Sequence, residues 1–165
     1  MAQAKIAIPT DTPLWLQEQL LGLYHEDWGL VYMASGNLAS IPFDTPIRWQ
    51  LGVDSIYRGL VCDLVKVKDY GATPDRASFL HSIRTLNPWG DGAAFWHATL
   101  IWDAPRLDKL IEAHFPAPDR HEDTLNPAFI EALEQIFAEN GVPWSDKPLL
   151  PIIPNATNSE APASS

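Results

Sequence analysis

His97 and Thr99 are the residues whose types and spacing most directly suggest chemistry. They stand in the run His97-Ala98-Thr99-Leu100, within the aromatic-rich stretch 94–102 that we predict to be a strand. Side chains alternate between the two faces of a strand. One face of this strand would be apolar and would carry Trp96, Ala98, Leu100 and Trp102. On the other face His97 and Thr99 would lie side by side, which places an imidazole that can act as a general acid or base beside a hydroxyl.

A histidine and a threonine in this arrangement resemble half of the site of the two-histidine phosphoesterases. That family needs the signature twice, on paired strands, so that two imidazoles flank one phosphorus as acid and base. The other histidines do not repeat the signature, because they read His25-Glu-Asp, His81-Ser-Ile, His114-Phe-Pro and His121-Glu-Asp. We therefore predict that His97 is a half-buried, hydrogen-bonded structural residue. A small hydrolase or phosphoesterase that uses His97 and Thr99 is the alternative.

Other catalytic or metal-binding patterns are weaker. The run 119–123, Asp-Arg-His-Glu-Asp, offers carboxylate and imidazole ligands close to His114, but it lies between prolines in what we expect to be a solvated loop. The sequence contains no Gly-x-Ser-x-Gly elbow and no glycine-rich phosphate loop. The single cysteine, Cys62, stands beside apolar residues and is interpreted as a packing residue. We expect neither a metal nor another cofactor.

The charge of the chain is strongly acidic and uneven. The net charge is −10, which argues against direct binding to nucleic acid because no basic stripe could neutralise phosphates. Residues 1–102 carry 7 basic and 10 acidic side chains, a net of −3, whereas residues 103–146 carry 3 basic and 10 acidic side chains, a net of −7. We predict that a basic protein partner is contacted by carboxylates of this second part: Asp119, Glu122, Asp123, Glu131, Glu134 and Glu139. The alternative is that they only keep the protein soluble.

The elements that must position these residues follow from apolar spacing and from local start and stop signals. Helices are predicted after Thr12-Pro13, over 54–70, after Thr73-Pro74-Asp75, over 105–115, and from Asn126-Pro127 to a stop at Gly141. A hairpin is predicted from strands at 30–35 and 38–43, in addition to the strand 94–102. The fold class is therefore α+β, with about five helices packed on a small, mostly antiparallel sheet. We expect one globular domain over 1–154 and a disordered tail over 155–165.

The sequence also allows predictions about tryptophan exposure, cellular compartment and function. Of the seven tryptophans, we expect Trp28, Trp49, Trp89 and Trp144 to be partly exposed. One cysteine, no apolar run of membrane-spanning length and no signal-like N-terminus favour a cytoplasmic protein that contacts no membrane. The leading hypothesis is a non-enzymatic inhibitor of a basic or nucleic-acid-processing protein, in the manner of toxin immunity proteins or phage inhibitors. An accessory subunit of a larger assembly is a further alternative.

Overall fold

The structure is a computed structural model that describes residues 11–36, 38–118, 124–145 and 147–154. These residues form α-helices, 3-10 helices and short strands in a mixed order along the chain. The α-helices are α1 (Thr12–His25), α2 (Pro46–Val61), α3 (Arg76–Thr85), α4 (Ala93–Ala98), α5 (Pro105–His114) and α6 (Pro127–Glu139). The 3-10 helices are η1 (Leu30–Ala34) and η2 (Lys68–Gly71), and the strands are β1 (Trp28–Gly29), β2 (Val65–Val67) and β3 (Leu100–Asp103).

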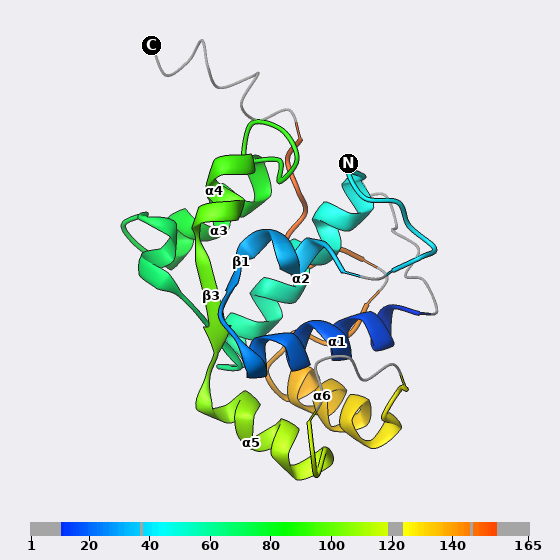
Figure 1. Cartoon of the computed structure of the whole chain (residues 1–165). Helices are drawn as coiled ribbons and strands as arrows, with labels where there is room; N and C mark the ends of the chain where they lie inside the picture. Colours follow the sequence, from blue (N-terminus) through cyan, green and yellow to red (C-terminus); the bar gives the residue numbers. More distant parts are fainter. Residues whose placement is uncertain (1–10, 37, 119–123, 146, 155–165) are drawn as a thin grey trace, which may run out of the picture.

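The three strands form one small antiparallel sheet in the order β1-β3-β2. Ile101 at its centre pairs with Trp28 on one side and with Val67 on the other, and it is fully buried. The predicted α+β class, helices around a small antiparallel sheet, is confirmed. Along the long axis of the molecule, α3 and α4 lie at one end, α5 and α6 lie at the other, and α1 and α2 lie between them (Figure 1).

Helices with a complete local start signal begin where the sequence predicts them. The side chains of Asp75 and Asn126 cap α3 and α6 by accepting hydrogen bonds from Ser78 N and Phe129 N. α5 begins at Pro105, a residue type that is favoured in the first helical turn because it needs no backbone donor there. α1 begins at Thr12, close to the predicted start after Thr12-Pro13, and Asp11 takes the cap position.

The predicted hairpin over 30–43 is wrong. Residues 30–34 form η1, in which Tyr32 alone is exposed while its neighbours are buried. η1 packs very closely on α2, because a Cβ atom at Gly52 would lie 2.7 Å from the Cβ of Ala34. The apolar side chains of residues 30–34 therefore pack against α2 and not against a returning strand.

The predicted helix over 54–70 is only partly correct. α2 begins earlier, at Pro46, and ends at Val61; the chain then reverses, so that β2 packs on the helix that precedes it. Gly59 makes this reversal possible, because a Cβ atom there would lie 2.6 Å from a methyl group of Val65. After β2, residues 69–72 all have positive φ, between 48° and 67°, which forms a left-handed turn that three non-glycine residues share.

The predicted strand over 94–102 is also wrong in its first half. Asn87 O accepts hydrogen bonds from Gly90 N and Gly92 N, and the tight turn that results leads directly into the short helix α4. Trp96 points inward from α4 and donates its indole N–H to Leu86 O at 2.6 Å. The strand itself, β3, is limited to residues 100–103.

None of the helices in the described ranges combines the length and the apolar character needed to span a bilayer. The predicted tail, 155–165, lies outside the described residues, and the division into a domain and a tail stays a prediction.

Candidate functional site: the acidic surface of the C-terminal helices

The exposed side of α6 carries the carboxylates that the sequence analysis selected. Phe129, Leu133 and Phe137 are buried on the inner side of the helix, and this fixes Glu131, Glu134 and Glu139 on the outer side, where all three are exposed. Gln135 Nε2 donates to Glu139 Oε1 at 3.0 Å. Within the described part of the chain, no cationic side chain is paired with Glu131 or Glu134. The other selected residues, Asp119, Glu122 and Asp123, lie outside the described residues.

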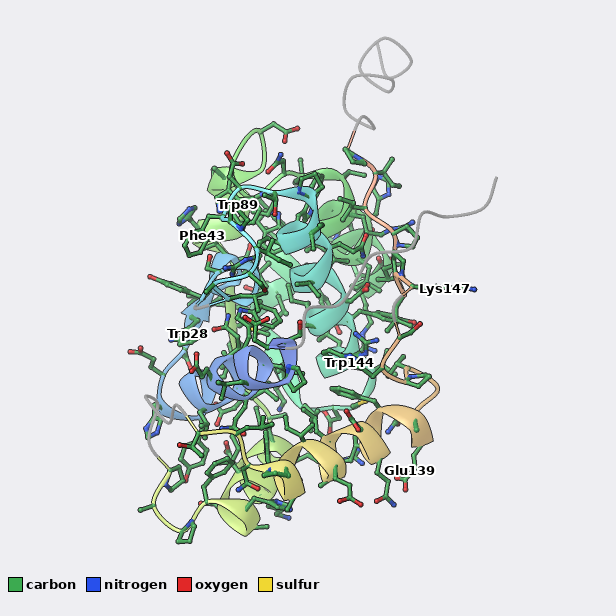
Figure 2. The ribbon with its side chains drawn as sticks, turned by 90° about the vertical axis from the view of Figure 1, so that its right-hand side faces the viewer. Trp28, Phe43, Trp89, Glu139, Trp144 and Lys147 are labelled. Atoms are coloured by element: carbon green, nitrogen blue, oxygen red, sulfur yellow. The ribbon has the colours of Figure 1, made fainter. Side chains whose placement is uncertain are left out.

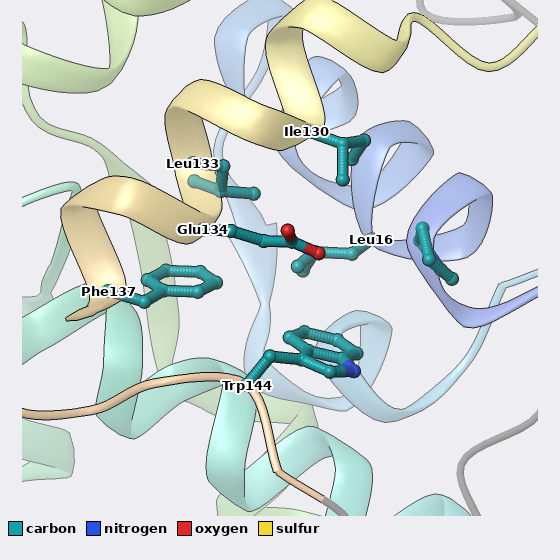
Figure 3. Close-up of a pocket in the computed structure, with 7 residues that line it drawn as sticks. Leu16, Ile130, Leu133, Glu134, Phe137 and Trp144 are labelled. Atoms are coloured by element: carbon teal, nitrogen blue, oxygen red, sulfur yellow. The ribbon is translucent and has the colours of Figure 1, made fainter.

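A small pocket lies between α1 and α6. Its wall is apolar except for one carboxylate, and it is lined by Pro13, Leu16, Ile130, Leu133, Glu134, Phe137 and Trp144. Its volume is about 10 Å³, which is room for about one water molecule. Figure 3 shows the Glu134 side chain extending across the pocket toward Leu16, with the Trp144 indole beneath the carboxylate.

Trp144 comes from the segment after α6 and is held by aromatic and cationic contacts. Its ring is nearly parallel to that of Phe137, with an angle of 14° and a centroid distance of 6.4 Å. The Arg58 guanidinium carbon lies 5.0 Å from the Trp144 ring centroid and 5.6 Å from that of Phe137. Arg58 also donates to Val142 O and Pro143 O, so one buried cation of α2 fixes both the backbone and the indole. Figure 2 shows Trp144 on the segment that follows the end of α6 near Glu139.

The rest of this segment is attached to α2 by side chains of the same helix face. We name residues 142–145 and 147–152 the C-terminal strap. Asp54 accepts hydrogen bonds from Leu149 N at 3.2 Å and from Leu150 N at 3.0 Å. Gln50 donates to Leu150 O and accepts from Ile152 N. Residues 50, 54 and 58 are four apart, so α2 presents them as one polar row along the strap.

A second group of carboxylates lies at the start of α5 and was not singled out from the sequence. It consists of Asp103 at the end of β3 with Asp108 and Glu112 on α5, whose four-residue spacing places both on one helix face. Tyr24 of α1 donates its hydroxyl hydrogen to Glu112 Oε2 at 3.1 Å. Burial, and then the hydrogen bond to Asp103 and its charge, raise the pKa of Asp108 to about 7. The negative charges of Asp103 and Glu112 therefore disfavour the ionised form of Asp108.

The pair His97 and Thr99 does not form the arrangement predicted for it. His97 is exposed on α4, whereas Thr99 is buried between α4 and β3. The two side chains therefore do not share a strand face, and the prediction of a half-buried, structural His97 is wrong because the segment is helical. Cys62 is fully buried, as expected of a packing residue, and burial raises the pKa of its thiol.

Metal ligands do not converge in the described ranges: they contain no group of three or more His, Cys, Asp or Glu side chains that could hold an ion. The run 119–123, which carried the metal hypothesis, lies outside those ranges. His114, its neighbour, has its Nδ1 2.9 Å from Leu110 O and packs against the ring of Phe129.

The exposure of the tryptophans agrees only in part with the prediction. Trp28, Trp89 and Trp144 are partly exposed as expected, but Trp49 is buried and donates its indole N–H to Ile83 O at 2.8 Å. Trp102, expected in the core, is partly exposed. Trp144 is the partly exposed tryptophan that borders the acidic side of α6.

Comparison of the chain with protein-family models, with curated proteins and with solved structures finds no match. The site must therefore be interpreted from its own geometry and charge.

Proposed function

We propose that this protein is a non-enzymatic binding protein that docks a basic protein partner on the outer side of α6, in the manner of toxin immunity proteins or phage inhibitors. The observation that carries the proposal is the exposure of Glu131 and Glu134 on one face of α6, without a paired cation among the described residues. Like charges one helical turn apart destabilise a helix slightly. A binding surface gives such an arrangement a use, because a cationic partner would relieve the repulsion.

The overall charge supports the same proposal. A net charge of −10 attracts basic proteins over a distance, and the excess is concentrated in residues 103–146, which include α5 and α6. The carboxylates of Asp103, Asp108 and Glu112 add to the negative potential at this end of the molecule. Burial is the main cause of the raised pKa of Asp108, and the negative charges of Asp103 and Glu112 raise it further.

The proposal is tested by reversing one charge on the docking surface and one elsewhere. Glu134→Lys and Asp91→Lys change the net charge by the same amount. Asp91 lies on the loop before α4, at the opposite end of the molecule from α6, where its side chain accepts only an exposed hydrogen bond from Asn87 N in the described structure (Figure 1). Full-length wild type and both variants would be immobilised and used to capture proteins from a lysate of the native host.

A basic protein retained by wild type and by Asp91→Lys, but lost with Glu134→Lys, is the expected result. It would then be purified for kinetic measurements. Loss of the same protein with both variants would show only a dependence on net charge, and retention by both would place the contact elsewhere.

A further inference from the structure

A hollow beside β2 is large enough to receive a segment of another protein. It is lined by residues of α2, β2, β3, η2 and the start of α3, and its volume is about 710 Å³. Pockets that enclose a whole small-molecule ligand have about 300–1,000 Å³. The walls of this hollow, which we name the β2 hollow, are open to solvent, because the four charged side chains that line it are all exposed: Asp63, Lys66, Asp69 and Arg76.

The charges that line the β2 hollow are not paired with one another. They are two carboxylates, Asp63 and Asp69, and two cations, Lys66 and Arg76. In the described part of the chain, none of these four side chains makes a hydrogen bond or an ion pair. Both signs of charge are therefore available to a ligand at one place on the surface.

Two aromatic side chains add contact area beside these charges. Trp102 and Tyr70 line the β2 hollow and are partly exposed. Trp102 is the partner of Lys66 in the pairing of β3 with β2, so the two side chains lie next to each other on the exposed face of the sheet. Tryptophan, tyrosine and arginine are the residue types that most often carry the binding energy of protein interfaces. The composition of the hollow therefore favours a protein as the ligand.

The backbone fixes the direction of three of the side chains that line the β2 hollow. Asp63, Asp69 and Tyr70 have positive φ, between 48° and 56°, and they are three of the five non-glycine residues with positive φ in the described ranges. Such conformations persist where the surrounding structure holds them, and they are common at ligand-binding sites. Thr73 Oγ1 donates to Tyr70 O at 2.6 Å and closes this turn. The side chains of Asp69 and Tyr70 are therefore positioned before a ligand arrives.

The order of the charges along β2 defines the ligand. Asp63 precedes the strand, Lys66 is its central residue and Asp69 follows it, so the sign of the charge alternates at a spacing of three residues. We propose that the β2 hollow binds an extended segment of a partner protein in which an acidic residue stands between two basic residues at the same spacing. The acidic side chain would lie beside Lys66 and Arg76, and the basic side chains would lie beside Asp63 and Asp69.

This ligand is distinct from a second copy of the chain and from the ligand of the proposed function. Pairing of two β2 strands centred on Lys66 would set one lysine against the other, and like charges directly opposite each other destabilise a sheet. The proposal goes beyond the proposed function, because the β2 hollow contains no residue of α6.

The proposal is tested with the full-length chain and two heptapeptides, Lys-Thr-Val-Glu-Val-Thr-Lys and Glu-Thr-Val-Lys-Val-Thr-Lys, both acetylated and amidated. The peptides have the same composition and net charge, so both are attracted equally by the overall charge of the protein. Binding is followed by NMR through the indole N–H signal of Trp102, which the variant Trp102→Phe identifies. Lys66→Gln removes one charge from the hollow, and Lys109→Gln is the matched control, because Lys109 is exposed on α5 and does not line the hollow.

We expect the peptide with the central glutamate to shift the Trp102 signal in a saturable way, and the peptide with the central lysine to bind at least threefold more weakly. Lys66→Gln should weaken binding of the first peptide roughly threefold, as for an exposed ion pair, and Lys109→Gln should leave it unchanged within error. Equal binding of the two peptides, an equal effect of the two substitutions, or no saturable shift would each overturn the proposal. A shift of the Trp102 signal with protein concentration alone would assign the hollow to a second copy and would also overturn it.

Discussion

Asp54 offers a quantitative test of how the C-terminal strap is held, and therefore of what positions Trp144. The carboxylate is 8% exposed and accepts hydrogen bonds from Leu149 N, Leu150 N and Gln50 Nε2. In Asp54→Ala the two backbone N–H groups lose their acceptor, and each would cost about 1–3 kcal/mol while it stays buried. Burial raises the pKa of Asp54, so removal of the carboxylate also relieves a desolvation penalty. We expect a net loss of about 3 kcal/mol in the free energy of unfolding.

Asp54→Asn provides the matched comparison. The amide oxygen can replace Oδ1, which accepts from Gln50 and Leu150, but the amide nitrogen then faces Leu149 N, which is 3.2 Å from Oδ2 in the wild type. Two donors cannot bond to each other, so we expect a loss of about 1–2 kcal/mol, smaller than for alanine.

Urea unfolding measures both losses, and amide hydrogen exchange locates them. In Asp54→Ala the amides of Leu149 and Leu150 should exchange faster than in wild type by more than the change in global stability explains. The account of the strap is refuted if these amides keep their wild-type protection, or if the alanine and asparagine variants lose the same stability within about 0.5 kcal/mol.

Three further predictions concern other parts of the molecule. The pKa of Asp108 is raised to about 7 in the folded chain, against 3.8 for an ordinary aspartate. The stability that this group contributes is therefore present below about pH 4 and is lost as the pH rises toward 7. Asp108→Asn should therefore be more stable than wild type at pH 8 by about 1 kcal/mol after allowance for solvent screening, and should lose this advantage at pH 4. Urea titrations at both pH values measure the difference, and a difference that does not depend on pH would contradict the prediction. Ala72→Gly should raise the unfolding free energy by about 0.5 kcal/mol, because Ala72 is exposed with φ 62° and glycine adopts this conformation without steric cost; a lower urea midpoint would contradict it. The thiol of Cys62 should react with an aromatic disulfide reagent at pH 8 only as fast as the chain opens, because it is buried and its pKa is raised; prompt stoichiometric labelling of the native protein would contradict this.

Much of the helical framework could be predicted because its signals are local. Asp75, Pro105 and Asn126-Pro127 each fix a helix start through contacts within one turn, and the apolar spacing of α6 correctly places Glu131 and Glu134 outside. These features need no knowledge of the rest of the chain.

The segment 93–98 could not be assigned in the same way. Its aromatic residues suit a strand, and the helix is favoured by hydrogen bonds in the preceding turn and by the long side chain of Trp96 reaching Leu86 O. The interpretation of His97 depended on this assignment and failed with it. Tertiary contacts override local propensity in such short segments.

The pocket was equally beyond a prediction from sequence. Glu134 was singled out, but Trp144 joins it only because Arg58 and Asp54, about 85 to 95 positions away in the chain, hold the strap against α2. No local sequence pattern predicts that a proline-rich segment is held by a row of polar side chains on a distant helix. The one signal in the sequence was Trp144, because an indole in such a segment would be unfavourable if it did not pack against another part of the chain.

The central claim, that the outer side of α6 docks a basic partner, is tested most directly by association kinetics. Once the partner has been captured, stopped-flow association of wild type and of Glu131→Lys/Glu134→Lys is measured at two ionic strengths. Electrostatic steering acts on the on-rate and is screened over a Debye length of about 8 Å at physiological salt. The account predicts that the double variant associates more slowly at low salt, with a flatter salt dependence and an unchanged fold. Equal on-rates and equal salt slopes for the two proteins would contradict it.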